Sequence, residues 1–117
     1  MKLRFRADSL RLRLNQVEVN KLADGKPIEE RVLFPGGQAL VYRLAPGDAA
    51  GCDARLAGST IDVSVPREQL KAWNDHEDIG FYFRAGSLSV AIEKDLECTD
   101  GPAEERDPYA FPRKAAC

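Results

Sequence analysis

Five cationic side chains open the chain at alternating positions, and their type and spacing could support chemistry. They lie within residues 2–14, KLRFRADSLRLRL, where Asp8 is the only acid. The five are Lys2, Arg4, Arg6, Arg11 and Arg13. An arginine guanidinium presents planar N–H donors that match phosphate and carboxylate oxygens in pairs. The segment therefore predicts a surface on which an anion could bind.

The residues between these cations predict a β-hairpin. Apolar residues recur at every second position before and after Asp8-Ser9, which is the period of a strand. A two-residue turn at Asp8-Ser9 pairs Ala7 with Leu10, Phe5 with Leu12 and Leu3 with Leu14. The same register places Arg6 opposite Arg11 and Arg4 opposite Arg13. Because like charges that face each other cost a few tenths to about 1 kcal/mol per pair, the cations need neutralisation.

Water and salt can supply that neutralisation on an open face, and the acidic end of the chain is a second source. Residues 93–107 carry seven acids and two cations, whereas residues 1–14 carry five cations and one acid. The acids are Glu93, Asp95, Glu97, Asp100, Glu104, Glu105 and Asp107. This segment could fold back across the hairpin as a strap, with Tyr109 and Phe111 as apolar anchors.

A bound ligand that carries phosphate or carboxylate groups is the third source of counter-charge. The candidate ligand-binding residues are Arg4, Arg6, Arg11, Arg13, Arg43 and Arg84. The formal net charge of the whole chain is −2, so composition gives no general reason to expect nucleic-acid binding. A small anionic ligand or a protein partner fits this charge pattern better.

No catalytic or metal-binding motif is present, and the sequence predicts no cofactor. His76, in NDHED, has the pattern of an exposed loop residue, because neighbouring acids rarely all point at one ion. Cys52, Cys98 and Cys117 lack CxxC spacing, which favours reduced thiols over a zinc site or a disulfide framework. The sequence therefore gives no support for enzymatic activity.

Two short helices are predicted downstream of the first hairpin. Asn15 can cap a helix that runs to Gly25, with Glu18 as its capping-box partner. Pro66 can occupy the first position of a second helix, PREQLKAW. Its two large apolar residues, Leu70 and Trp73, are three apart and share one face. That face should join the core.

Three further hairpins follow from alternating patterns around turn residues. Residues 28–34 and 38–44 flank PGG, where loops of three and of five residues both fit. Gly58-Ser59 suits a type II′ turn and pairs Leu56 with Ile61, Ala54 with Val63 and Arg55 with Asp62. A turn at Ala85-Gly86 pairs Phe83 with Leu88, Phe81 with Val90 and Ile79 with Ile92.

These elements predict an α+β fold, mainly of antiparallel β-hairpins that form a barrel or sandwich with two short helices. Residues 1–98 should form one globular domain, and Trp73, Phe81 and Phe83 should lie in its core. Residues 99–117 contain three prolines and many acids without periodicity, so we expect an irregular acidic tail that is ordered only in part.

Composition places the chain among soluble globular domains. It has 117 residues, of which 44% are hydrophobic and 31% charged. The chain opens with alternating charges rather than a secretory apolar run, and no stretch approaches the roughly 18 apolar residues of a membrane span. We therefore expect a cytoplasmic protein.

Two segments carry a resemblance to a known group of proteins. SLRLRLNQVEVNKL and VAIEKDLEC, the latter followed by an acidic stretch and DPYAFP, resemble a family of small uncharacterised bacterial proteins. The resemblance implies a bacterial domain over most of the chain, and it implies no activity, substrate or site. The opening hairpin is also similar in fold to the SLxxRxP-type hairpin of swapped-hairpin antitoxins that bind DNA. The chain lacks the Gly-Asn and the Pro of that motif.

The function that best fits these patterns is a small non-enzymatic binding or interaction module of the bacterial cytosol. The alternative is a phosphate-ligand or nucleotide-binding protein that uses the arginine face of the first hairpin.

Overall fold

The computed structural model describes residues 1–96 and 108–112, and within these ranges it has an α+β fold. In chain order the elements are β1 (Lys2–Arg6), β2 (Ser9–Leu14), α1 (Gln16–Ala23), β3 (Ile28–Leu33), β4 (Ala39–Gly47), β5 (Asp53–Ala57), β6 (Thr60–Pro66), α2 (Arg67–Asp75), β7 (Gly80–Ala85) and β8 (Leu88–Lys94). The predicted fold class is confirmed.

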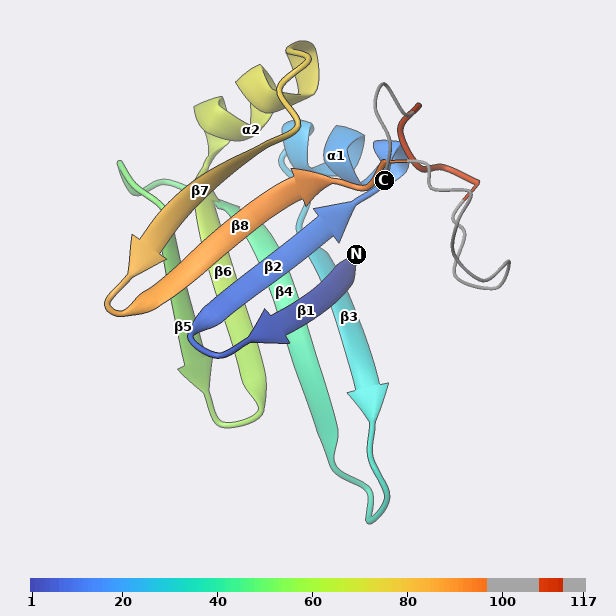
Figure 1. Ribbon diagram of the computed structural model, residues 1–117, viewed down its shortest axis with the longest axis vertical. Coiled ribbons are helices and arrows are strands. Elements are labelled where there is room, and N and C mark those ends of the chain that lie inside the picture. Colours follow the sequence, from blue (N-terminus) through green and yellow to red (C-terminus); the bar gives the residue numbers. More distant parts are fainter. Residues whose placement is uncertain (97–107, 113–117) are drawn as a thin grey trace.

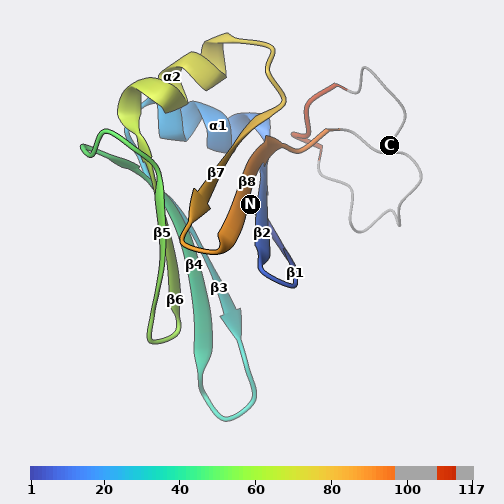
Figure 2. The same cartoon turned by 60° about the vertical axis from the view of Figure 1, so that its left-hand side comes forward.

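The strands form two four-stranded sheets (Figure 1). Sheet A has the order β1-β2-β8-β7, and sheet B has the order β3-β4-β6-β5. Each sheet joins two antiparallel hairpins through one parallel contact, β2 beside β8 in sheet A and β4 beside β6 in sheet B. The sheets face each other as a sandwich (Figure 2) and do not close into a barrel.

The chain consists of two halves with the same order of elements. β1, β2, α1, β3 and β4 are followed by β5, β6, α2, β7 and β8. The first hairpin of each half pairs with the second hairpin of the other half. The first hairpin of each half has the same register. Arg4 of β1 lies opposite Arg11 of β2, and at the equivalent positions Arg55 of β5 lies opposite Asp62 of β6. The molecule is therefore an internal pseudo-dimer with exchanged hairpins.

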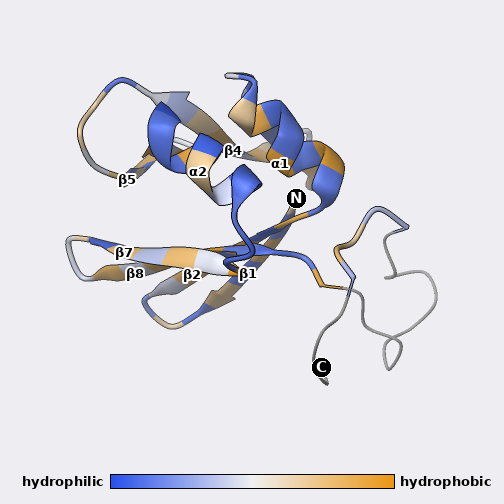
Figure 3. Ribbon diagram, turned by 90° about the horizontal axis from the view of Figure 1, so that it is seen from above, coloured by the Kyte–Doolittle hydropathy of each residue, from blue (hydrophilic) through white to orange (hydrophobic). Residues whose placement is uncertain are grey.

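The core lies between the sheets, and both helices cover the same end of the sandwich, where they pack on each other (Figures 1 and 3). Equivalent positions of the two halves are buried: Leu10 and Ile61, Leu12 and Val63, Leu14 and Val65, Val19 and Leu70, Leu22 and Trp73. Burying such a side chain contributes about 1.5–3 kcal/mol, so this shared pattern is the main source of stability.

Both predicted helices are confirmed. The Asn15 side chain accepts from the Glu18 N–H at 2.9 Å, and the Glu18 carboxylate accepts from the Asn15 N–H at 3.0 Å. This reciprocal capping box satisfies two backbone donors at the start of α1. α2 begins at Arg67, so Pro66 precedes the helix instead of opening it. Leu70 and Trp73 are buried in the core, as the sequence predicts.

The predicted registers of the first and last hairpins are wrong by two residues. Phe5 lies opposite Leu10 rather than Leu12, and Phe83 lies opposite Val90 rather than Leu88. The connecting residues are Ala7-Asp8 and Gly86-Ser87. A shift of two residues leaves every side chain on its own face, so the apolar pattern cannot choose between the two registers. Ala7 and Gly86 open these turns with φ of 49° and 62°, as Gly58 does with 58°.

The two middle hairpins agree with the sequence analysis. Arg55 lies opposite Asp62, and Leu56 lies opposite Ile61, around Gly58-Ser59. Residues 34–38 connect β3 to β4, and the Phe34 N–H donates to the Gln38 carbonyl at 2.7 Å. The five-residue alternative for this loop is therefore the observed one.

Part of the predicted C-terminal tail packs on the domain. The Phe111 N–H donates to the Asp95 carbonyl at 2.7 Å, and the Phe111 side chain packs against the core. The Gln16 N–H donates to the Tyr109 carbonyl at 3.0 Å. Residues 108–112 are thus anchored between the end of β8 and the start of α1. Five of the predicted strap acids lie outside the described residues: Glu97, Asp100, Glu104, Glu105 and Asp107.

In the part of the chain that the structure describes, no helix is long and apolar enough to cross a membrane.

Candidate anion-binding site

The outer face of sheet A carries the predicted cations in rows that run across all four strands. Successive residues of a strand point to opposite faces, so the register fixes which side chains share this face. Row 1 contains Arg6, Ser9, Ser89 and Arg84. Row 2 contains Arg4, Arg11, Ala91 and Tyr82. Row 3 contains Lys2, Arg13, Glu93 and Gly80.

A pocket of about 540 Å³ lies on this face, and every residue of rows 1 and 2 lines it. Short side chains occupy three of the four positions on its two central strands, Ser9, Ser89 and Ala91, and Arg11 occupies the fourth. Longer side chains border this floor on the edge strands, from Arg4 and Arg6 of β1 to Tyr82 and Arg84 of β7. The volume falls within the range of about 300–1,000 Å³ that is usual for small-molecule sites.

Three of the four pocket arginines have no carboxylate partner among the described residues. These are Arg4, Arg6 and Arg84, and all three are exposed. Arg4 also lies directly opposite Arg11, so two like charges face each other across β1 and β2. The predicted opposition of arginines is therefore present, although the partners differ from the predicted pairs. An anion placed among these groups would relieve their repulsion.

Glu93 is the carboxylate that borders the pocket from row 3. Its Oε1 lies 3.1 Å from Nε of Arg11 and 3.6 Å from Nε of Arg13. The Tyr82 hydroxyl donates to Glu93 Oε2 at 2.9 Å. This hydrogen bond, together with partial burial and the charge of Glu93, raises the pKa of Tyr82 above its ordinary value. Glu93 thus neutralises Arg11 and Arg13 on the outer face of sheet A, and it fixes the Tyr82 ring.

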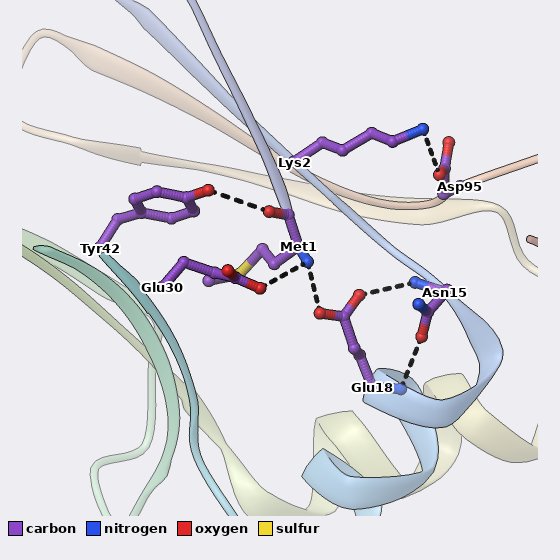
Figure 4. Close-up of polar contacts among 7 residues, drawn as sticks. All are labelled: Met1, Lys2, Asn15, Glu18, Glu30, Tyr42 and Asp95. Atoms are coloured by element: carbon purple, nitrogen blue, oxygen red, sulfur yellow. Dashed lines mark hydrogen bonds and ion pairs between the residues drawn. The ribbon is translucent and has the colours of Figure 1, made fainter. Parts of the chain in front are cut away.

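Asp95 supplies a second carboxylate to the basic hairpin. Its Oδ2 lies 2.8 Å from Nζ of Lys2, and the Asp95 side chain is almost buried (Figure 4). Two acids of the predicted internal counter-charge, Glu93 and Asp95, therefore do contact the first hairpin. They act at row 3 and at the start of β1, whereas the unpaired arginines lie in rows 1 and 2.

The start of β1 is held in place by polar contacts that join the two sheets and α1 (Figure 4). The ammonium of Met1 contacts the carboxylates of Glu18 and Glu30, the latter at 3.2 Å. The Tyr42 hydroxyl donates to the Met1 carbonyl at 3.1 Å. These contacts fix the strand that carries Arg4 and Arg6.

Two predicted site residues lie away from the pocket. Arg13 is in row 3, beside Glu93. Arg43 is on β4 of sheet B, where it lies opposite Asp62 of β6 with 3.9 Å between the charged groups. The structure thus brings Arg4, Arg6, Arg11 and Arg84 together and separates the other two.

Sheet B provides an internal comparison, because the repeat of the two halves relates its outer face to the outer face of sheet A. Asp62 stands at the position equivalent to Arg11, and Asp53 at the position equivalent to Lys2. Arg55, the equivalent of Arg4, donates from Nε to Asp53 at 2.9 Å. This hydrogen bond holds the pKa of Asp53 below its ordinary value. Sheet B therefore sets acids beside Arg43 and Arg55 and leaves one arginine of this face, Arg31, without a carboxylate partner, whereas sheet A leaves three within the described residues.

The other polar candidates form no site in the described part of the chain. No group of three or more metal-ligating side chains occurs there, and His76 is exposed at the end of α2. The Cys52 thiol contacts Gln69 Oε1 at 3.5 Å, and burial raises the pKa of Cys52. A raised pKa keeps the thiol protonated and unreactive. Cys98 and Cys117 lie outside the described residues.

The sequence analysis missed the pocket residues that carry no positive charge. Ser9 lies opposite Arg6 within the first hairpin, whereas Ser89 and Tyr82 join the site only because β2 pairs with β8 in parallel, although the two strands are far apart in the chain. Alternation within each hairpin could have placed these residues on the outer faces. No local signal, however, joins the first hairpin to the last.

Fold and site together define a two-sheet α+β sandwich with a basic pocket on one outer face. The chain belongs to a family of unknown function, DUF7009, whose model matches residues 1–114. This finding agrees with the resemblance to an uncharacterised family. No curated protein and no solved structure matches the chain.

Proposed function

We propose that this protein is a binding module for an anionic ligand, which occupies the pocket on the outer face of sheet A. One observation carries the proposal: Arg4, Arg6 and Arg84 surround one pocket and have no carboxylate partner among the described residues. A guanidinium is satisfied by two or more oxygen acceptors in a fixed geometry, and phosphate or carboxylate groups provide them. The proposal places the protein in the bacterial cytoplasm.

The contrast between the two sheets supports this proposal. A surface that needs cations only for solubility has no reason to concentrate them on one of two equivalent faces. On sheet B the same fold pairs Arg55 with Asp53 and sets Arg43 beside Asp62. On sheet A the positions equivalent to Asp53 and Asp62 are occupied by the cations Lys2 and Arg11. We attribute this difference to a ligand that supplies the missing negative charge.

A thermal-stability titration tests the proposal. The full chain is heated with inorganic phosphate, nucleotides, polyphosphate or short DNA at several salt concentrations. A ligand that binds only the folded state stabilises it by about 2.7 kcal/mol at a concentration of 100 times its Kd. We expect at least one anion to raise the Tm in a concentration-dependent way, less strongly at high salt.

Two variants give this titration a matched control. Arg84→Gln removes a pocket cation and should abolish most of the shift in Tm. Arg55→Gln removes an exposed arginine of sheet B and should leave the shift as in the wild type. If no anion shifts the Tm of the wild-type protein, the anion-binding function is wrong, and an interaction module with a protein partner takes its place.

A further inference from the structure

The arrangement of rows 1 and 2 indicates the chemical class of the ligand as well as the sign of its charge. In row 1 two arginines stand at the ends and two serines at the centre, in the order Arg6, Ser9, Ser89, Arg84. Adjacent strands are about 4.8 Å apart, so the backbones of Arg6 and Arg84 are separated by about 14 Å. Long arginine side chains can reach inward from both edges over the short serines. One tetrahedral oxyanion fits between them.

The serine hydroxyls can complete such a site. Ser89 Oγ has no hydrogen-bond partner among the described residues. Ser9 Oγ donates to the Arg6 carbonyl at 2.8 Å, and its rotation would redirect the proton toward a ligand. Row 1 therefore offers two forked cations and two hydroxyls to a single phosphate-sized group.

Row 2 offers a second, separate place for negative charge. Arg4 and Arg11 face each other there, two residues along the strands from row 1. Two residues of a strand span about 6.8 Å, so a group held by Arg4 lies beside the first anionic group and not on top of it. Tyr82 stands at the far end of row 2 with 64% of its surface exposed. Its ring offers a flat surface to a neutral part of the ligand.

Along the strands, an acidic residue follows rows 1 and 2 at each end. Glu93 lies in row 3 and already pairs with Arg11 and Arg13. Asp8 lies in the turn that follows row 1, and its carbonyl accepts from the Ser89 N–H at 2.9 Å. A phosphate chain that continued beyond row 2 would meet the Glu93 carboxylate. The three arginines without a carboxylate partner among the described residues therefore fit two anionic groups better than a long polyanion.

From this geometry we propose that the ligand is a small molecule with two adjoining anionic groups, of the diphosphate class, one held in row 1 by Arg6 and Arg84 and one in row 2 by Arg4. This inference rests on the proposed function and adds the ligand class. The inference predicts weaker binding of nucleic acid and of long polyphosphate, because only Arg4, Arg6 and Arg84 lack a carboxylate partner among the described residues of the pocket.

Isothermal titration of the full chain with three probes tests the inference: inorganic phosphate, pyrophosphate and a short single-stranded DNA. We expect pyrophosphate to bind at a ratio of one to one with a Kd about tenfold or more below that of phosphate, since a second charge-assisted contact is made. Arg84→Gln should weaken both probes. Arg4→Gln should weaken pyrophosphate about tenfold and leave phosphate nearly unchanged. Arg55→Gln, in sheet B, should change neither.

The outcomes separate this inference from the proposed function. Equal affinities for phosphate and pyrophosphate, or equal losses for both probes in Arg4→Gln, would overturn the two-group ligand and leave anion binding intact. DNA that binds more tightly than pyrophosphate, with a steep salt dependence, would assign the face to a polymer and also overturn the inference. Binding of none of the probes, nor of the anions of the thermal titration, would overturn both proposals.

Discussion

At the scale of single residues, positions on the outer face of sheet A differ in the space that they leave for a side chain. Arg4 and Arg11 face each other on hydrated strands, where like charges can be tolerated. Gly80, at the β7 end of row 3, has no space for a side chain. A Cβ atom there would lie 2.4 Å from the Ile92 carbonyl oxygen and 2.9 Å from Cγ of Glu93. The close approach of β7 to β8 therefore requires glycine.

We predict that Gly80→Ala destabilises the protein by about 1–3 kcal/mol, because backbone atoms of β8 cannot move aside without breaking the ladder. Chemical denaturation of the variant measures this loss. Gly51→Ala is the control, because a Cβ atom at Gly51 meets nothing within 4 Å. Equal stability of the Gly80 variant and the control would show that the strands do not approach so closely.

At the scale of elements, the end of β8 gathers charged groups that connect the last hairpin to the rest of the domain. Lys94 is buried, donates from Nζ to the His76 carbonyl at 2.7 Å, and lies over the rings of Trp73 and Phe111 at 5.8 and 5.2 Å from their centroids. A buried ammonium requires such partners, because its desolvation is costly. Phe111 therefore covers a cation as well as apolar core.

We predict that Phe111→Ala lowers the free energy of unfolding by about 1–3 kcal/mol, since it removes a half-buried ring and uncovers Lys94. Phe34→Ala is a control of the same residue type, with a side chain in the β3–β4 loop that is 51% exposed. The measurement is urea unfolding of both variants. A loss no larger than that of the control would contradict the anchoring of residues 108–112.

At the scale of the whole molecule, the two sheets are joined by core packing and by a few polar contacts. Tyr42 belongs to sheet B, and its hydroxyl donates to the Met1 carbonyl beside sheet A. Burial, followed by the charges of Glu30 and Glu18, raises the pKa of Tyr42 above its ordinary value. The folded state therefore holds this proton more tightly than the unfolded chain does. The stabilisation is complete below about pH 10 and is lost as the pH rises through the raised pKa.

We predict two effects of Tyr42→Phe. At neutral pH it should lower the free energy of unfolding by about 0.5–1.5 kcal/mol, because the contact between the sheets is lost. Above about pH 10 the difference from the wild type should shrink, because only the wild type can ionise at this position. Thermal melts from pH 7 to pH 11 measure both effects. A difference that stays constant over this range would show that Tyr42 ionises equally in both states.

Sequence alone determined the local structure of this protein. The capping box of Asn15, the alternation in each strand and the turn at Gly58-Ser59 depend on residues that are close in the chain, so their energetics can be evaluated locally. The first and last registers were mispredicted because a two-residue slip keeps the faces unchanged and only the turn conformation at Ala7 and Gly86 separates the alternatives.

Tertiary structure decided how the hairpins are combined, and with it the site. The repeat of two halves emerges only in the structure, because the halves share a pattern of burial, as in Leu12 and Val63, and not a pattern of polar residues. The basic character of the face was predictable from residues 2–14. The pocket was not, because Arg84 and Ser89 reach it only through the parallel pairing of β2 with β8. That pairing joins segments from opposite ends of the chain, and burial of the shared core stabilises it rather than any local preference.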